Sequence, residues 1–153
     1  MRHIAIIPAR SGSKGLKDKN IKNLCGKPLM AYTIQAAIES GIFDCVHVST
    51  DSATYAEIAK DYEADVPFLR DREYATDSAS TWETAKNVLS KYSDLGEMFD
   101  IVTILQPTTP LRTYEDICNA YKLFCNKDAL SVVSVCEVEH SPLLCNTLGN
   151  DFS

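Results

Sequence analysis

The segment from Pro8 to Asn20, PARSGSKGLKDKN, combines small residues with a local excess of positive charge. Its two glycines and two serines allow backbone amides to approach and surround phosphate oxygens. Its cations are Arg10, Lys14, Lys17 and Lys19, four within ten residues. This composition suits a polyphosphate bound together with a divalent metal ion. The alternative, a solvated loop that binds nothing, is less favoured, because long loops between a strand and a helix are uncommon and often functional.

The glycine spacing excludes two familiar phosphate-binding motifs. Gly12 and Gly15 do not have the spacing of a Walker A loop, and Gly26-Lys27 is followed by Pro28 instead of Ser or Thr. The GxGxxG dinucleotide motif is also absent from this segment. Any phosphate bound here is therefore held by a different kind of loop.

The elements that would position this loop follow from an alternation of short apolar runs with segments of helical spacing. Such alternation favours an α/β fold with a mostly parallel sheet and right-handed crossovers. We expect strands at Ile4–Pro8, Cys45–Ser49, Val66–Leu69, Ile101–Leu105 and Leu130–Cys136. Ligands of such sheets bind beyond the carboxyl ends of the strands. The polar segments that follow the first four strands are therefore expected to share one edge.

The expected helices begin and end at recognisable residues. Pro28 suits the first position of a helix whose apolar residues run from Leu29 to Ile38 and which stops at Gly41. Ser80, with Glu83 three residues later, forms a capping-box pattern at the start of another helix.

The overall composition limits the class of protein. The chain has 153 residues with 15 basic and 21 acidic side chains, a net charge of −6, so a broad surface for nucleic acid or an anionic membrane is not expected. The six cysteines include no CxxC pair, which argues against a zinc or redox motif. The first apolar run is too short for a signal peptide or a membrane span. We expect one nucleotide-binding domain over residues 1–153 and a cytoplasmic location.

Several separated segments carry a family resemblance. IIPARSGSKGLKDKNIKNLCGKPLMAYTI, at residues 6–34, resembles the opening signature of the CMP-N-acylneuraminate (CMP-sialic acid) synthetases. The related 3-deoxy-manno-octulosonate cytidylyltransferases share its GKPL segment. Later segments agree in order and spacing: VHVSTDS at 46–52, FLRDREYATDSAS at 68–80, ILQPTTPLRT at 104–113 and VVSVCEVEHSP at 132–142. The resemblance implies a Rossmann-like, three-layer nucleotide-diphospho-sugar transferase fold.

The resemblance also implies a nucleotidyltransferase activity. In the family, a hydroxyl at the anomeric centre of an acylneuraminate attacks the α-phosphorus of CTP, which gives the CMP-sugar and pyrophosphate. Chemistry of this kind consists mostly of positioning and charge neutralisation. The implied catalytic residues are Lys19, Arg10 and Asn20. The implied nucleotide-binding residues are Arg10, Ser11, Gly12, Ser13, Gly15, Lys19, Asn20, Arg70, Ala79 and Ser80.

Two of these residues have a structural alternative. Arg70 matches a family arginine that contacts the nucleotide, but the residues alone favour a surface salt bridge with Asp71 or Glu73. Ser80 matches a family serine near the cytosine, and this role is compatible with its role as a helix cap. Backbone groups around Ala79 and Ser80 would supply the donor and acceptor partners that the cytosine edge needs.

The sugar-binding residues are expected after the fourth strand. Gln106 occupies the position where other nucleotide-sugar transferases usually carry a metal-binding aspartate, and in the family this glutamine faces the sugar. Arg112 either meets an anion or forms an ion pair with Glu115 or Asp116, and both alternatives stay open. The implied substrate-binding residues are Gln106, Thr108, Thr109 and Arg112.

The family's magnesium and dimer contacts depend on a later segment. The aspartates that bind the catalytic Mg²⁺ in the family would lie beyond residue 153. Asp51 and Asp77 lie near the expected site edge, but neither matches that position. We therefore expect a C-terminally truncated member with Mg²⁺ as an implied cofactor, no metal ligand in this chain, and a homodimer at full length.

Two alternatives to an acylneuraminate enzyme stay open. The first is a cytidylyltransferase for another acidic nine-carbon sugar, legionaminate or pseudaminate, because the deciding sugar contacts lie largely outside the chain. The second is a catalytically inactive nucleotide-binding module. All three hypotheses share CTP as a ligand.

Overall fold

The computed structural model describes residues 1–12, 15–76 and 79–137. The chain divides into two compact units, Met1–Asn119 and Ala120–Ser153, and each is described by itself. Residues 138–153 of the second unit lie outside the described ranges.

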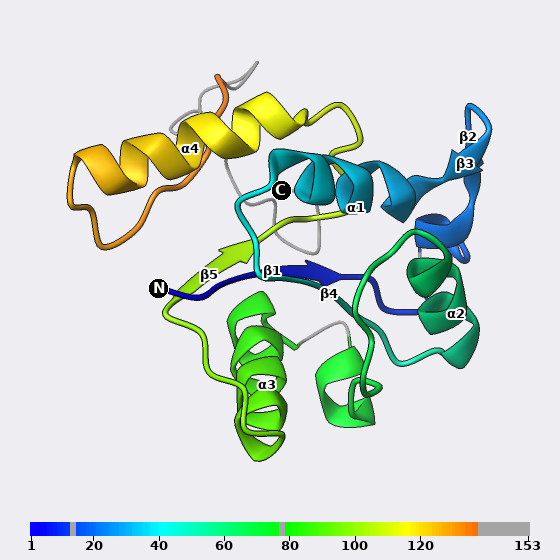
Figure 1. Cartoon of the computed structure of the whole chain (residues 1–153). Helices are drawn as coiled ribbons and strands as arrows, with labels where there is room; N and C mark the ends of the chain where they lie inside the picture. Colours follow the sequence, from blue (N-terminus) through cyan, green and yellow to red (C-terminus); the bar gives the residue numbers. More distant parts are fainter. Residues whose placement is uncertain (13–14, 77–78, 138–153) are drawn as a thin grey trace, which may run out of the picture. The chain divides into compact units, whose positions relative to one another are not determined.

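A parallel sheet forms the centre of the first unit (Figure 1). It contains β1 (His3–Pro8), β4 (Cys45–Ser49) and β5 (Ile101–Ile104) in the order β4-β1-β5. Pro8 pairs with Ser49 on one side of β1, and Ile6 pairs with Ile104 on the other. The three carboxyl ends therefore meet at one edge, as the sequence predicts.

Helices cover both faces of this sheet. α1 (Leu29–Ser40) and α2 (Ala53–Asp61) lie on one face, and α3 (Thr81–Asp94) lies on the other (Figure 1). Successive side chains of a strand point to opposite faces. Accordingly, Ala5 and Ile7 of β1 join the core cluster with α1 and α2, whereas Ile4 and Ile6 join the cluster with α3. The three-layer α/β fold predicted from the sequence is confirmed.

Local signals explain most element boundaries. Gly41 ends α1 in the left-handed conformation at φ 64. Pro28 is the residue directly before α1, so the helix begins one residue later than predicted. At the start of α3, Ser80 and Glu83 exchange both hydrogen bonds of the predicted capping box. α4 (Tyr114–Asn126) begins in the first unit, where Ile117 packs against the α1–α2 cluster.

The segment between β1 and α1 contains structure that the sequence analysis did not predict. A short 3-10 helix, η1 (Lys19–Ile21), is followed by an antiparallel pair, β2 (Asn23–Leu24) and β3 (Lys27–Pro28). The two residues that join this pair, Cys25 and Gly26, have φ values of 48 and 100. Positive φ at both central positions is typical of the type I′ hairpin turn.

The predicted third strand, Val66–Leu69, is wrong. In the structure the residue before this segment, Asp65, makes a single bridge to His47 of β4. Pro67 follows Val66 and has no N–H to donate, so the ladder does not continue past Asp65. The segment leads into η2, a 3-10 helix at Arg72–Ala75.

The predicted fifth strand, Leu130–Cys136, is also wrong within the part of the chain that the structure describes. Residues 130–137 contain no helix or strand, and the side chains of Leu130, Val133 and Val135 are exposed. A strand needs hydrogen bonds to a neighbour, and no described residue supplies them. Within the described ranges, no helix has both the length and the apolar composition of a membrane-spanning helix.

Candidate active site

The segments that follow β1 and β4 lie side by side at the carboxyl edge of the sheet. The strand pairing continues one step past Pro8, where the Ala9 N–H donates to the Ser49 carbonyl oxygen at 2.9 Å. Arg10 and Ser11 therefore come next to the residues that follow Ser49. Arg70 joins them, because its N–H donates to the Thr50 carbonyl oxygen at 2.7 Å.

Arg70 is a buried side chain with only 7% of its surface exposed. Its Nε donates to Ser49 Oγ at 3.0 Å and its NH2 to the Ser49 carbonyl at 2.6 Å. The surface salt bridge that the sequence favoured is wrong, since Asp71 instead accepts a bond from Lys91 Nζ at 2.8 Å. Arg70 is thus fixed against the end of β4, where the resemblance places nucleotide contacts.

A second guanidinium lies near Arg70, because Arg70 NH1 donates to the Tyr74 carbonyl and Arg10 NH1 to the carbonyl of the next residue, Ala75. Burial lowers the pKa of Arg70 to about 10, the carboxylate of Asp51 opposes this, and the charge of Arg10 lowers the pKa further. Arg70 therefore stays protonated at neutral pH while it feels the repulsion of Arg10. Two cations held together against repulsion are well placed for a polyanionic ligand.

Arg10 and Asn20 are joined at the start of the same loop. Arg10 NH1 donates to the Ala75 carbonyl at 3.4 Å, and Asn20 Nδ2 donates to the Arg10 carbonyl at 3.1 Å. Asn20 is 4% exposed, and its buried Oδ1 has no hydrogen-bond partner among the residues described. A buried acceptor without a partner is unfavourable in a fold and often marks a functional group.

The 3-10 helix η1 places Lys19 directly before Asn20. Asp18, which precedes it, adopts the left-handed conformation at φ 54 and accepts a hydrogen bond from Tyr55 OH at 3.1 Å. Tyr55 belongs to α2 and is buried. Lys19 and Asn20 are therefore positioned from two sides, by α2 through Asp18 and by β1 through Arg10.

Ser11 is bound at both of its donors by Asp51, which follows β4. Its N–H donates to Asp51 Oδ1 and its Oγ to Asp51 Oδ2, both at 2.7 Å. Partial burial favours the neutral acid, but the bonds from Ser11 outweigh this and lower the pKa of Asp51. Asp51 is thus a carboxylate inside a cationic cluster.

Two glycines of the loop, Gly12 and Gly15, have open space beside their backbone. A Cβ added to Gly12 or to Gly15 would meet no atom within 4 Å, and Gly12 has a φ of 69 that favours glycine. Ser13 and Lys14, as well as Asp77, lie outside the described residues.

Ser80 and Gln106 come together at the start of α3. Ser80 Oγ accepts the N–H of Glu83 at 3.1 Å, which confirms its role as a cap. Gln106 Nε2 donates to Oγ1 of Thr81, the residue after Ser80, at 3.4 Å. The segments assigned by resemblance to the base and to the sugar are therefore neighbours, with Ala79 half-buried beside them. Their contacts with ligands stay predictions.

Arg112 folds back onto its own turn. Its NH2 donates to the Gln106 carbonyl at 2.9 Å, and it also bonds to Thr109 Oγ1. The ion pair with Glu115 or Asp116 is not what the structure has, since Asp116 accepts the N–H of Thr113 at 2.9 Å. Arg112 NH1 is buried without a partner within the described ranges, so contact with an anion stays open. Thr108 is exposed on the same turn.

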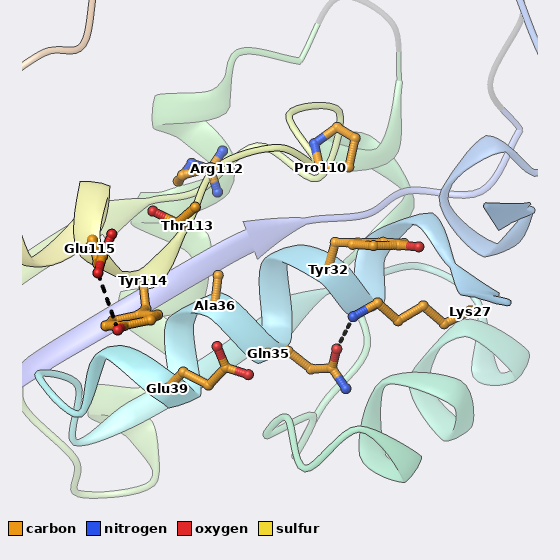
Figure 2. A pocket seen from close by; sticks show the side chains of 10 residues that line it. All are labelled: Lys27, Tyr32, Gln35, Ala36, Glu39, Pro110, Arg112, Thr113, Tyr114 and Glu115. Carbon is orange, nitrogen blue, oxygen red and sulfur yellow. Dashed lines mark hydrogen bonds between the residues drawn. The ribbon is translucent and has the colours of Figure 1, made fainter. Parts of the chain in front are cut away.

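A pocket of about 350 Å³ lies between α1 and residues 110–115 (Figure 2). Its polar side chains already contact one another. Lys27 bonds to Gln35 and lies 4.1 Å from the centre of the Tyr32 ring, and Tyr114 OH donates to Glu115. Of the predicted site residues, only Arg112 lines it. We therefore place the candidate site at the Arg10–Arg70 cluster and not in this pocket.

The described residues do not fit a resident metal ion by themselves. They contain no group of three or more His, Cys, Asp or Glu side chains that could hold one. The nearest carboxylates, Asp51 and Asp18, accept hydrogen bonds from Ser11 and Tyr55.

Comparison with known proteins decides the family. The family model described as cytidylyltransferase matches residues 4–148. The chain belongs to the cytidylyltransferase family. The resemblance predicted from the sequence is thereby confirmed.

Two curated relatives show how this chain compares with longer proteins. The N-acylneuraminate cytidylyltransferase of Escherichia coli is 51% identical over 121 residues, which are 79% of this chain and 28% of the relative. The CMP-N,N'-diacetyllegionaminic acid synthase of Legionella pneumophila is 42% identical over 148 residues, 97% of this chain and 63% of the relative. The chain thus spans less than two thirds of either relative.

A solved structure supports the fold of this chain. The CMP:2-keto-3-deoxy-manno-octonic acid synthetase complexed with CTP matches with a TM-score of 0.72 at 22% identity. The match covers 85% of this chain and 50% of that chain. At this identity the likeness shows the fold alone.

Three residues that hold the loop are not predicted from the sequence: Ser49, Asp51 and Tyr55. Ser49 is predicted only as the end of a strand, and Asp51 is compared only with the family's metal position. A carboxylate directly after the second strand, at the edge where Ser11 was expected, was the available signal. Its use required the register that pairs Pro8 with Ser49.

Proposed function

We propose that the protein is a nucleotidyltransferase that activates an acylneuraminate with CTP. The anomeric hydroxyl oxygen of the sugar attacks the α-phosphorus of CTP. The bond from that phosphorus to the β-phosphate oxygen breaks, and the products are the CMP-sugar and pyrophosphate. The observation that carries the proposal is the pair of guanidiniums at the carboxyl edge: Arg10 NH1 donates to the Ala75 carbonyl and Arg70 NH1 to the carbonyl of the preceding residue, Tyr74.

The proposed roles follow from charge and position. Arg10, Lys19 and the backbone around Gly12 bind the triphosphate, together with Arg70 at the end of β4. Asn20 offers its buried, unpartnered Oδ1 to a donor of the ligand. The cations and the backbone N–H groups, not the Asn20 oxygen, stabilise charge that develops on the transferring phosphoryl group. Ser11, Ser13 and Gly15 complete the loop as the resemblance implies.

Base and sugar selection are assigned to the start of α3 and the turn after β5. Backbone groups near Ala79 and Ser80 contact the cytosine. The acidic sugar meets Gln106, Thr108, Thr109 and Arg112. The hydrogen bond from Gln106 to Thr81 supports this arrangement, because it joins the two segments.

Mg²⁺, a homodimer at full length and a cytoplasmic location also belong to the proposal. Mg²⁺ usually binds through one or two carboxylates plus substrate phosphates. The described residues contain no group of three or more His, Cys, Asp or Glu side chains that could hold the ion, so the Mg²⁺ proposal rests on the family resemblance.

A legionaminate substrate is the second candidate, because the L. pneumophila relative is a CMP-N,N'-diacetyllegionaminic acid synthase. Pyrophosphate release from CTP and magnesium, measured with each acid sugar in turn, separates the two. CTP binding without turnover by any sugar would favour a binding module. Equal calorimetric affinity for CTP and UTP would contradict the proposed reading of the cytosine edge.

The central prediction concerns Lys19. We expect Lys19→Ala to reduce turnover about 100-fold, because it removes a cation beside the transferring phosphate. Lys22→Ala is the matched control, since Lys22 is an exposed cation just after η1, and its turnover should change little. Pyrophosphate release measures both variants, and CTP calorimetry serves if the chain binds without turnover. An unchanged Lys19→Ala protein would remove Lys19 from the mechanism.

A further inference from the structure

Asp51 is a carboxylate in a cationic site that is proposed to bind a triphosphate, where a negative charge is not expected. It is half-buried at the carboxyl edge, and its charge acts on Arg70, which also feels Arg10. An isolated anion here would repel a triphosphate. Its presence in a cationic site therefore calls for a structural reason.

The hydrogen bonds of Asp51 supply that reason. Its two carboxylate oxygens accept the N–H and the Oγ–H of Ser11, each at 2.7 Å. Ser11 lies between Arg10 and Gly12, so the two hydrogen bonds fix the backbone on which the Arg10 side chain and the Gly12 amide depend for their positions. They also tie the segment after β1 to the segment after β4.

The same bonds occupy the donors of Ser11. A phosphate ligand needs N–H or O–H groups directed at its oxygens. In this structure the N–H and the hydroxyl of Ser11 both point to Asp51. Ser11 is therefore turned toward β4, and the neighbouring Gly12 has open space beside its Cα.

We propose that Asp51 is a positioning residue for nucleotide binding, and that Ser11 acts through Asp51 instead of as a direct phosphate ligand. This inference rests on the proposed function and deepens it. The Ser11–Asp51 latch holds Arg10 and the Gly12 backbone in the geometry that receives the triphosphate. Its negative charge also reduces the repulsion between Arg10 and Arg70.

A double-mutant cycle on the full chain tests the latch. The CTP dissociation constants of the wild type, Ser11→Ala, Asp51→Ala and the double variant are measured by calorimetry. We expect Asp51→Ala to weaken CTP binding about tenfold, and the double variant to be no weaker than Asp51→Ala, because contacting groups are not additive. Asp51→Asn keeps one acceptor for the Ser11 N–H and should retain more affinity than Asp51→Ala.

Two outcomes would overturn the latch. Additive losses in the double variant would make Ser11 an independent ligand. Unchanged or tighter CTP binding by Asp51→Ala would show that Asp51 acts on the triphosphate only by charge repulsion and does not position the loop. If Asp51→Ala does not fold, the same cycle with Asp51→Asn gives the answer. A wild-type chain that does not bind CTP would refute the proposed function as well, so the two failures are distinguishable.

Asp44 provides a matched control at the opposite edge of the sheet. Its Oδ2 accepts the N–H of His3 at 2.6 Å, which is the same kind of bond to the other end of β1. We expect Asp44→Ala to lower the melting temperature while the CTP dissociation constant stays unchanged. A loss of CTP affinity equal to that of Asp51→Ala would show that general loosening of β1 explains both, and would overturn the positioning role.

Discussion

The two edges of the central sheet use the same device in different electrostatic surroundings. At each edge an aspartate accepts a backbone N–H at an end of β1, Asp44 from His3 and Asp51 from Ser11. At the amino edge, Arg2 forms a salt bridge with Glu97 and lies 4.7 Å from the centre of the Phe99 ring. At the carboxyl edge, the Arg70 guanidinium donates hydrogen bonds to neutral oxygens of Ser49 and Tyr74.

This difference separates a structural cation from a ligand-binding one. A guanidinium paired with a carboxylate on the surface has little charge left to offer an anion. A guanidinium held by hydroxyl and carbonyl oxygens is fixed in position, and its charge stays available. The hydrogen bonds of Arg70 to neutral oxygens thus fix it for an anionic ligand, while the nearby carboxylate of Asp51 acts on it through charge alone.

The largest expected effect comes from removing Arg70. Arg70→Ala should weaken CTP binding about 100-fold. It should also lower the free energy of unfolding by about 2–3 kcal/mol, because buried hydrogen bonds to a charged group are lost. Calorimetry with CTP and urea unfolding measure the two effects.

Arg2→Ala is the control for Arg70→Ala at the other edge. Arg2 is exposed, so its removal should change stability little and leave CTP binding as it is. CTP binding by Arg70→Ala at wild-type strength would abolish the proposed difference between the edges. Arg70→Lys should recover only part of the affinity, since an ammonium group cannot reproduce the bonds to Ser49 and Tyr74.

The sequence predicted the elements whose signals are local. The apolar runs of β1, β4 and β5, the stop at Gly41 and the capping box at Ser80 all lie within a few residues of the feature they define. The strand expected at Val66–Leu69 was wrong because strand pairing depends on a partner elsewhere in the chain, and Pro67 interrupts it. The strand expected at Leu130–Cys136 was wrong for a similar reason, because no described residue pairs with this exposed segment.

The candidate site was predicted at the level of segments and not of contacts. The topology rule for parallel sheets brought Arg10, Ser11 and Arg70 to one edge, as found. The burial of Arg70 and the bonds between Ser11 and Asp51 depend on which residue of β1 stands opposite which residue of β4. Sequence spacing carries no information on that register.

The core and the carboxyl edge differ in how pH affects them, because only unfolding lets the core residue His47 take up a proton near neutral pH, whereas Arg70 and Asp51 at the edge keep their charges. Burial, together with the charge of Arg70, lowers the pKa of His47 to about 3. Unfolded His47 takes up a proton near its ordinary pKa of 6.5, whereas folded His47 does not. Stability is therefore full above pH 6.5 and falls as the pH drops toward 3, by at most about 1.4 kcal/mol per unit for this residue.

Urea unfolding between pH 7.5 and 5 measures this slope. His47→Leu should flatten it, and Tyr92 OH, which bonds to His47 Nδ1, would keep its contact with Cys45 Sγ. Arg70 and Asp51 keep their charges over this range, because the pKa of Arg70 is about 10 and that of Asp51 is lowered. A slope that is the same in His47→Leu would assign the acid sensitivity to other groups.

The smallest expected effect distinguishes two helix caps with the same hydrogen-bond pattern. Ser80 and Glu83 exchange bonds at the start of α3, and Thr113 and Asp116 do so before α4. Ser80→Ala and Thr113→Ala should each lower the free energy of unfolding by about 1 kcal/mol. Only Ser80→Ala should also weaken CTP binding, about threefold, because loosening the first turn of α3 moves the backbone near Ala79 that is proposed to contact the cytosine. Equal losses of CTP affinity in both variants would mean that the base is not read at the start of α3, since the two caps differ only in which segment they hold.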